Sequence, residues 1–268
     1  MTNIRNDLKQ WFADCPFALT AFSGGVDSSL VAWLANHFLG PKNNLAVISA
    51  SPSLKLSDLD DAKDFARENG LPLRIIETQE MLNPDYVLNP ANRCFFCKQT
   101  LYQELETLAA NHHPCWVLNG TNVDDLGDYR PGLQAAKTFE VRSPLAECGM
   151  NKDDVRELAA ALNLSCWNKP AAPCLSSRIP YGQRVTLAKL RRIEKAEAWL
   201  QEHGFEICRV RHEEPFTARV EVDTERVAEL HTLSSNLESA FSDMGFTKVV
   251  LDEEGFVSGK LNRVLKEV

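Results

Sequence analysis

The chain carries eight cysteines, and the positions of three of them favour reactive or metal-binding thiols. Cys94 and Cys97 form a C-x-x-C pair, and Cys174 lies in a proline-rich loop near Arg178, whose charge would lower the pKa of the thiol and favour the nucleophilic thiolate. No second C-x-x-C and no His pair at the spacing of zinc ligands completes a tetrahedral zinc site. Three thiolates can hold a [4Fe-4S] cluster with one open iron if the Cys174 loop folds back. The others are interpreted as buried or incidental thiols: Cys15, Cys115, Cys148, Cys166 and Cys208.

A second candidate site is a glycine-rich loop between a short apolar segment, 16–22, and a helical pattern over 28–39. Glycines let a backbone approach an anion closely, and the amides and dipole of a helix N-terminus attract one. No Gly-Lys-Ser/Thr follows, so this is not a Walker A loop. An ordinary capped turn is the alternative, but the full string between strand and helix favours phosphate binding. The loop reads Ser23, Gly24, Gly25, Val26, Asp27, Ser28 and Ser29.

A third motif, GTNVDDLGDYRPG at 120–132, follows another apolar segment, 115–118. Carboxylates at a strand end near a triphosphate suit Mg²⁺, and an arginine can hold a phosphate through two hydrogen bonds. A solvated turn is the alternative, and the choice among the carboxylates stays open. The candidate nucleotide ligands are Gly120, Asn122, Asp125 and Arg130, with Asp128 a candidate for the metal. The motif SPLAE at 143–147 is weaker. Two interpretations of Glu147 stand equal: an acid that supports the site from behind its ligands, or a surface residue.

Positive charge gathers after the Cys174 loop. Residues 175–220 hold nine Lys or Arg against six Asp or Glu, whereas 221–268 hold five against ten. Arg209 and Arg211 alternate in an expected strand, so both side chains point to one face. That geometry suits the phosphate of a mononucleotide, although two solvated arginines would give the same pattern.

The elements that must position these residues alternate along the first part of the chain. Strand-like segments at 16–22, 45–50, 73–77, 115–118 and, more weakly, 138–141 are separated by helical patterns. Such alternation predicts an α/β fold with a parallel, doubly wound sheet covered on both faces. We expect a phosphate-binding domain over 1–168, a loop and linker with Cys174 over 169–184, and a smaller α+β domain over 185–268.

Composition excludes several classes of protein. The 268 residues are 44% hydrophobic and 25% charged, as in globular proteins. The net charge of −8 makes nucleic acid an unexpected partner. No apolar run approaches the ~20 residues of a membrane span, and the N-terminus lacks the apolar core of a signal peptide. A cytoplasmic location is therefore expected.

The string SGGVDSS resembles the PP-loop of ATP pyrophosphatases, and the whole set of motifs, with CLSSRIPYG at 174–182, is similar to the LarE-type sulfur transferases. These are pyridinium-3,5-bisthiocarboxylic acid mononucleotide synthases of nickel-pincer cofactor biosynthesis. The resemblance covers nearly the whole chain. It implies a five-stranded sheet, ATP with Mg²⁺, adenylation of a carboxyl group on a pyridinium dicarboxylate mononucleotide, and thiolation through Cys174.

The resemblance also assigns further roles. The Arg209 and Arg211 pair would grip the substrate phosphate, and Glu197 and Glu221 match acidic positions where carboxylates can bind a metal. The three-cysteine form of the family implies a [4Fe-4S] cluster, with Cys94, Cys97, Cys174 and Arg178 as the catalytic set. A homo-oligomer formed through the second domain is expected, and the sulfur donor is left open.

Three alternatives remain at this point. In the sacrificial form of the family, Cys174 gives up its own sulfur and becomes dehydroalanine. A tRNA thiolase of the PP-loop family also combines C-x-x-C with a distant cysteine, but it would need a basic surface or a zinc finger. A nucleotide-sensing module needs no exposed thiol, which counts against it.

Overall fold

The computed structural model describes residues 2–127, 131–171 and 173–265. The chain forms two compact units. The first contains Met1–Glu80 and Asn92–Ala172, and the second contains Met81–Ala91 and Pro173–Val268. The chain therefore passes from one unit to the other three times, after residues 80, 91 and 172.

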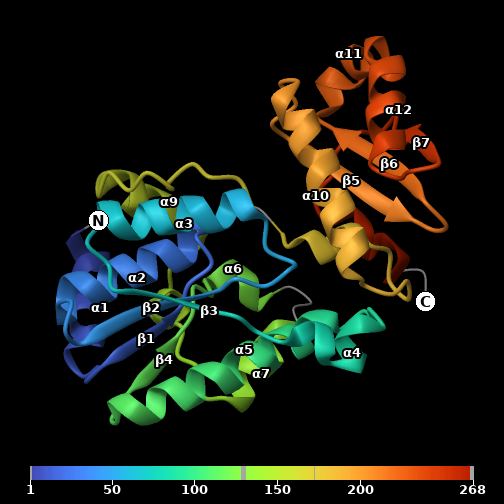
Figure 1. The fold of residues 1–268 in the computed structure, drawn as a ribbon. Helices are drawn as coiled ribbons and strands as arrows, with labels where there is room; N and C mark the ends of the chain where they lie inside the picture. The colour runs from blue at the N-terminus through green and yellow to red at the C-terminus, as the bar shows by residue number, and fades with distance from the viewer. Residues whose placement is uncertain (1, 128–130, 172, 266–268) are drawn as a thin grey trace. The chain divides into compact units, whose positions relative to one another are not determined.

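A parallel sheet forms the centre of the first unit (Figure 1). Its strands are β1 (Ala18–Ala21), β2 (Asn44–Ser49), β3 (Leu73–Ile76) and β4 (Trp116–Leu118), in the order β3-β2-β1-β4. The two inner strands are short and apolar because both of their faces are buried. The α/β class that the sequence predicted is confirmed.

The expected fifth strand is not formed, and the prediction of five strands is wrong for the described residues. Arg142 makes only an isolated parallel bridge to Leu118. The amide of Ser143 donates to the Glu147 carboxylate at 2.8 Å, and Pro144 has no amide hydrogen. Within the expected segment itself, Thr138 is the last residue of α7, and the amides of residues 139–141 donate to carbonyls of that helix.

Helices cover both faces of this sheet. Leu8 and Phe12 of α1 (Thr2–Ala13) pack with α2 (Val26–Leu39), α3 (Leu56–Glu68) and α9 (Lys152–Ala161) in one apolar cluster. Tyr102 and Leu105 of α5 (Arg93–Ala109) pack with α7 (Pro131–Thr138) in a second cluster. The two clusters take alternate residues of β1 and β2, which is the doubly wound arrangement. Shorter elements are η1 (Glu80–Leu82), η2 (Ala110–His112), α6 (Val123–Leu126) and α8 (Pro144–Glu147).

The second unit is an α+β structure around a three-stranded sheet of order β5-β6-β7. β5 (Cys208–Glu213) pairs antiparallel with β6 (Thr217–Val222), and β7 (Lys248–Leu251) pairs parallel with β6. Its helices are α10 (Leu187–Glu202), α11 (Val227–Thr232) and α12 (Ser234–Asp243), with α4 (Pro84–Val87), η3 (Leu175–Arg178), η4 (Thr224–Arg226) and η5 (Lys260–Leu265).

The segment Met81–Ala91 belongs to this second unit, although the sequence analysis assigned it to the first domain. Asn89 is fully buried, and its amide nitrogen donates to the carbonyls of Ile179 at 3.1 Å and Pro180 at 2.8 Å. The Tyr86 hydroxyl lies 2.6 Å from that of Ser176. These side chains fasten the segment to η3 and the loop that follows it.

His212 is buried in the core of the second unit and makes its stability depend on pH. Its Nε2 accepts from Arg192 at 2.8 Å, and its Nδ1 has no partner among the described residues. Burial, then the charges of Arg192 and Lys189, lowers the pKa of His212 from 6.5 to about 4, while Glu214 acts the other way. Because the folded state binds fewer protons between these values, the free energy of unfolding falls as pH drops through that window.

We therefore expect roughly 3 kcal/mol of stability to be lost between pH 6.5 and 4 through this one residue. Urea unfolding at several pH values would measure the loss. The His212→Leu variant serves as the control, since it removes the titrating ring and should lose correspondingly less over the same range. An equal loss in both proteins would contradict the assignment.

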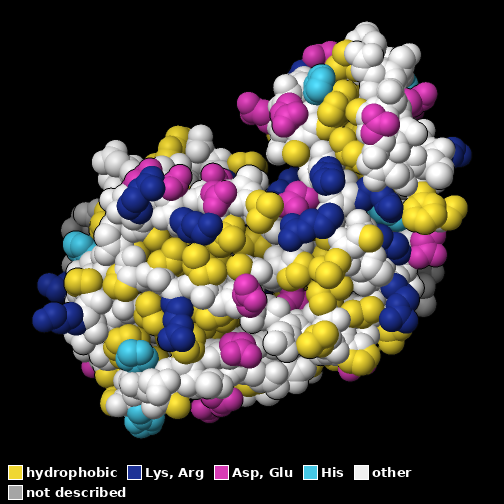
Figure 2. Space-filling view, viewed as in Figure 1, with side chains coloured by type: hydrophobic (Ala, Val, Ile, Leu, Met, Phe, Trp, Pro, Cys, Tyr) yellow, Lys and Arg dark blue, Asp and Glu magenta, His cyan; other side chains and the backbone are white. Residues whose placement is uncertain are grey.

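Charged side chains of both signs are interspersed over the face shown in Figure 2. Hydrophobic side chains gather between them on the part that belongs to the first unit. Within residues 2–127, 131–171 and 173–265, none of the helices has the length and apolar character needed to cross a membrane.

Candidate active site

The glycine-rich loop joins β1 to α2, as the sequence predicted, and leaves the start of α2 open to an anion. Gly24 has a φ of 73°, which favours glycine, and Gly25 is the N-cap without a capping side chain. The Ser28 hydroxyl lies 2.9 Å from that of Ser23 and donates to the Gly25 carbonyl at 3.2 Å. The first amides of a 14-residue helix therefore lack side-chain acceptors in the described structure.

Ser29 contributes differently from the prediction. It is fully buried, and its hydroxyl has no hydrogen-bond partner among the described residues. Its side chain therefore packs behind the loop, and only its backbone is part of the predicted anion site.

The end of β4 lies directly against this helix start. A Cβ placed on Gly120 would come within 2.5 Å of the Ser28 nitrogen, so glycine is required there. The Asn122 amide nitrogen then donates to the Asp27 carboxylate at 2.9 Å. Asn122 and Asp125 also form a capping box at α6, in which the backbone N–H of Asn122 donates to the Asp125 carboxylate at 3.2 Å. The two residues thus shape the loop, and Arg130 and Asp128 lie outside the described residues.

Lys152 is a member of this site that sequence reasoning missed. Its ammonium group lies 3.0 Å from the Asp27 carboxylate, and its amide donates to Asp124 at 2.8 Å. Asn151 and Asp154 form a capping box that starts α9 at Lys152. That box is visible in the sequence, but the partner of the lysine, 125 residues earlier, is not.

Cys174 lies at the start of η3 in the second unit, and Arg178 holds its backbone. The Arg178 guanidinium donates to the carbonyls of Pro173 and Cys174, the latter at 3.1 Å. Arg178 itself is fully buried and makes a two-point ion pair with Glu197 at 2.8 and 3.1 Å. Burial opposes its charge, but Glu197 raises the pKa of Arg178 above its ordinary value. Arg178 therefore acts on the loop backbone, as a positioning residue.

Arg209 and Arg211 lie two residues apart in β5, on one face of the second sheet. Arg211 makes a two-point ion pair with Glu221 at 3.0 and 2.9 Å and donates to the Ser177 carbonyl at 2.7 Å. The Arg209 guanidinium lies 4.9 Å from the ring centre of Phe256, and burial, followed by the charge of Arg178, lowers its pKa. A phosphate would offset this crowding of positive charge.

Glu197 and Glu221, the expected metal carboxylates, are both paired with arginines. Glu197 also accepts from the Val210 amide at 3.0 Å, so its two oxygens hold Arg178 and β5 together. Over the described parts of the chain, no three His, Cys, Asp or Glu side chains are grouped as metal ligands.

The C-x-x-C pair is part of a helix. The helix α5 begins at Arg93, so Cys94 and Cys97 share its first turns. Residues three apart on a helix are neighbours, and a helix N-terminus stabilises a thiolate. Cys94 is exposed, and Cys97 and Cys174 are partly exposed. By contrast, burial raises the pKa of Cys15 to about 12 and that of Cys115 to about 11.

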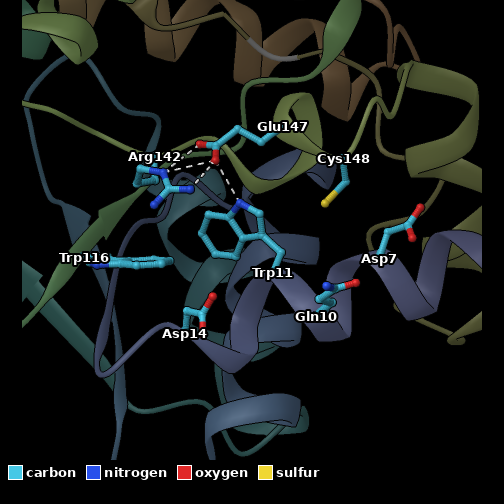
Figure 3. Close-up of a pocket in the computed structure, with 8 residues that line it drawn as sticks. All are labelled: Asp7, Gln10, Trp11, Asp14, Trp116, Arg142, Glu147 and Cys148. Atoms are coloured by element: carbon cyan, nitrogen blue, oxygen red, sulfur yellow. Dashed lines mark hydrogen bonds and ion pairs between the residues drawn. The ribbon is translucent and has the colours of Figure 1, made fainter.

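Glu147 belongs to a separate cavity of about 450 Å³ beside α1 (Figure 3). It holds Arg142 by a two-point ion pair and accepts from the Trp11 indole at 2.8 Å. Although partial burial acts in the opposite direction, these bonds lower the pKa of Glu147. The Arg142 guanidinium lies 4.4 Å from the ring centre of Trp116. The glutamate thus has a structural role at this cavity.

Comparisons with known proteins agree with these features. The NAD synthase family model matches residues 2–86, which include the phosphate loop. The chain is 46% identical to the uncharacterized protein slr1717 of Synechocystis over 97% of both chains. It is 36% identical to the pyridinium-3,5-bisthiocarboxylic acid mononucleotide synthase of Lactiplantibacillus plantarum, over 91% of this chain and 88% of that protein. The chain therefore belongs to the family of pyridinium-3,5-bisthiocarboxylic acid mononucleotide synthases and is an ATP-dependent enzyme of the PP-loop type.

Proposed function

We propose that the protein adenylates a carboxylate of a pyridinium-3,5-dicarboxylate mononucleotide with ATP and then replaces the adenylate with sulfur. The product would be the thiocarboxylate used in nickel-pincer cofactor biosynthesis. The observation that carries the proposal is the 36% identity to the L. plantarum synthase across nearly the whole chain. The open helix start at the phosphate loop supports it.

The first step, adenylation of the substrate, would take place at the phosphate loop. A carboxylate oxygen of the substrate attacks the α-phosphorus of ATP, a P–O bond forms, and pyrophosphate leaves. The amides of Asp27 and Ser28 and the Ser23 hydroxyl would hold the pyrophosphate end. Lys152 lies against Asp27 and would add positive charge where negative charge builds up on the leaving group. Mg²⁺ is proposed as the counterion of ATP, and Asp128 remains a proposed ligand.

The second unit supplies the proposed substrate phosphate site. Arg209 and Arg211 share one face of β5, and Arg211 is held in place by Glu221. A phosphate can accept from both guanidinium groups, whose planar donors match its oxygens. Glu197 and Glu221 would then act by orienting arginines. A metal at either carboxylate would have to displace the arginine that it now holds.

The second step needs a sulfur nucleophile at the acyl adenylate. Sulfur attacks the carbonyl carbon, and the C–O bond to AMP breaks. We propose that Cys94, Cys97 and Cys174 together hold a [4Fe-4S] cluster, and their exposure and the i,i+3 spacing of the first two fit this ligand set. Three thiolate ligands leave one iron open, which supplies a site for an added sulfide.

We further propose that the enzyme is a homo-oligomer through its second unit.

Metal analysis of cysteine variants tests the cluster. After anaerobic purification, the wild type is expected to contain about four irons and four sulfides per chain. Cys94→Ala, Cys97→Ala and Cys174→Ala should each lose them, while Cys208→Ala, a change at a buried thiol, should keep them. Iron, sulfide and zinc assays on the same samples give the result.

A different outcome identifies the sacrificial reaction. If the wild type has no iron and Cys174 loses the mass of H₂S after incubation with ATP and substrate, its own Cβ–Sγ bond has broken and dehydroalanine remains. Turnover of a tRNA instead of the pyridinium mononucleotide would favour the tRNA thiolase. Zinc in place of iron would contradict the cluster.

A further inference from the structure

A buried carboxylate stands beside the phosphate loop and is not used by the steps above. Glu80 is 1% exposed and accepts from the hydroxyls of Thr78, at 2.6 Å, and Ser51. A carboxylate has acceptors only, so both hydroxyls must point their hydrogens at it. The structure records no cation at this carboxylate among the described residues.

Glu80 thereby fixes which hydroxyl donates and which accepts along two chains of hydrogen-bonded hydroxyl groups. The Ser49 and Thr78 hydroxyls lie 2.6 Å apart, and since the Thr78 hydrogen goes to Glu80, Ser49 is the donor between them. The hydroxyls of Ser53 and Ser51 lie 2.7 Å apart, and Ser53 donates for the same reason. The hydrogen of Ser49 is committed inward, which leaves its oxygen as an acceptor.

The β1–β2 pairing places Ser49 next to the phosphate loop. Ala21 pairs with Val47, and the Phe22 amide still donates to the Val47 carbonyl at 2.8 Å. Ser23 therefore leaves the sheet at the level of Ser49, on a neighbouring strand ~4.8 Å away. A nucleotide whose phosphates lie at this loop would extend its nucleoside toward the neighbouring strand ends, because ligands of open α/β sheets lie at the carboxyl ends of the strands.

The loop that carries Ser51 and Ser53 is held close to the same place. It leads from β2 into α3, and a Cβ on Gly24 would lie 3.0 Å from the Cβ of Ala62 in that helix. The Ser53 amide donates to the Ser51 hydroxyl at 3.0 Å, so the Ser51 oxygen is saturated. The hydrogen bonds from Glu80 through Ser51 thus stiffen the loop, and those through Thr78 orient the Ser49 hydroxyl.

We propose that Glu80 is a positioning residue for nucleoside recognition, which polarises Ser49 to accept a hydrogen bond from the nucleoside of ATP. The inference rests on the proposed function, because it requires ATP phosphates at the loop. The matching donor is a ribose hydroxyl or the adenine amino group.

Binding measurements with and without the nucleoside test this role. Glu80→Gln keeps the shape but gives the side chain a donor, which reverses one hydroxyl chain. Its Kd for ATP is expected to rise about tenfold, the equivalent of one hydrogen bond. Its Kd for inorganic tripolyphosphate should stay unchanged. Glu77→Gln, which removes an exposed carboxylate three residues earlier, is the matched control and should bind both probes as the wild type does.

Two further probes separate the possible donors. If the wild type prefers ATP to 2′-deoxy-ATP and Glu80→Gln loses that preference, the ribose is the donor. If the preference for ATP over inosine triphosphate is lost instead, the adenine amino group is the donor. Either result supports the proposal. If Glu80→Gln does not fold, Ser49→Ala should show the same selective loss.

Two other results would contradict the proposed role of Glu80 in nucleoside recognition. An unchanged Kd for ATP, or an equal loss for ATP and tripolyphosphate, would mean that Glu80 has a purely structural role. A wild type that binds neither probe would instead refute the proposed ATP site itself, so the two failures are distinguishable.

Discussion

Gly120→Ala is expected to lose about 10²-fold in ATP-dependent adenylation, because the added methyl group cannot fit. Its Cβ would lie 2.5 Å from the Ser28 nitrogen and 2.8 Å from the Asp27 carbonyl carbon, and both are backbone atoms. The start of α2 must therefore move, and a displacement of about 1 Å at a reacting centre costs about that factor. Overpacking should also lower the free energy of unfolding by roughly 1–3 kcal/mol.

Pyrophosphate exchange and urea unfolding would measure the two effects. Gly127→Ala is the matched control, since among the described residues the nearest atom to its Cβ would be the Asp124 carbonyl oxygen, at 4.0 Å. The two variants make the same chemical change within one loop, so they separate the close approach from a general effect of replacing glycine. Wild-type exchange by Gly120→Ala would show that the backbone of α2 does not approach residue 120 so closely.

Arg178→Met is expected to destabilise the second unit by about 3–5 kcal/mol and to abolish sulfur transfer. The variant leaves the Glu197 carboxylate buried without its cation, which is the costly way to break an ion pair. It also removes the donors that hold the Pro173 and Cys174 carbonyls. The phosphate loop and the proposed substrate ligands Arg209 and Arg211 are unchanged in this variant, so pyrophosphate exchange should persist if the variant folds.

A double-mutant comparison separates stability from positioning. Arg178→Met with Glu197→Leu removes both charges and should recover most of the stability but not sulfur transfer. Arg184→Met, the same change at an exposed arginine of the following loop, should leave both properties intact. Restored sulfur transfer in the double variant would contradict a positioning role for Arg178.

Local patterns were sufficient to predict much of the fold. The strands β1 to β4 appear in the sequence as short apolar segments. The inner strands β1 and β2 are packed between two helical layers, whereas the edge strand β3 is partly exposed. The segment at 138–141 looks similar, but Thr138 ends α7 and the next three amides donate to carbonyls of that helix. These bonds close a helix where a strand was expected, and a hydrophobic pattern does not register them.

The site was predictable only where it is local. The phosphate loop is one continuous string, and its residues lie where the sequence placed them. The role of Arg178 depends on Glu197, 19 residues away, and that of Lys152 on Asp27, 125 residues away. A pattern within one segment does not specify such partners, so the ion pair of Arg178 was not predicted and Lys152 was overlooked.

The threefold passage of the chain between units has a consequence for its synthesis. Residues 81–91 leave the ribosome long before their partners, since Asn89 bonds to Ile179, 90 residues later. At about 5–20 residues per second, this segment waits roughly 5–20 s before its buried contacts can form. The second unit cannot be completed before the first has been made, and its earliest segment must stay unfolded or chaperoned in the meantime.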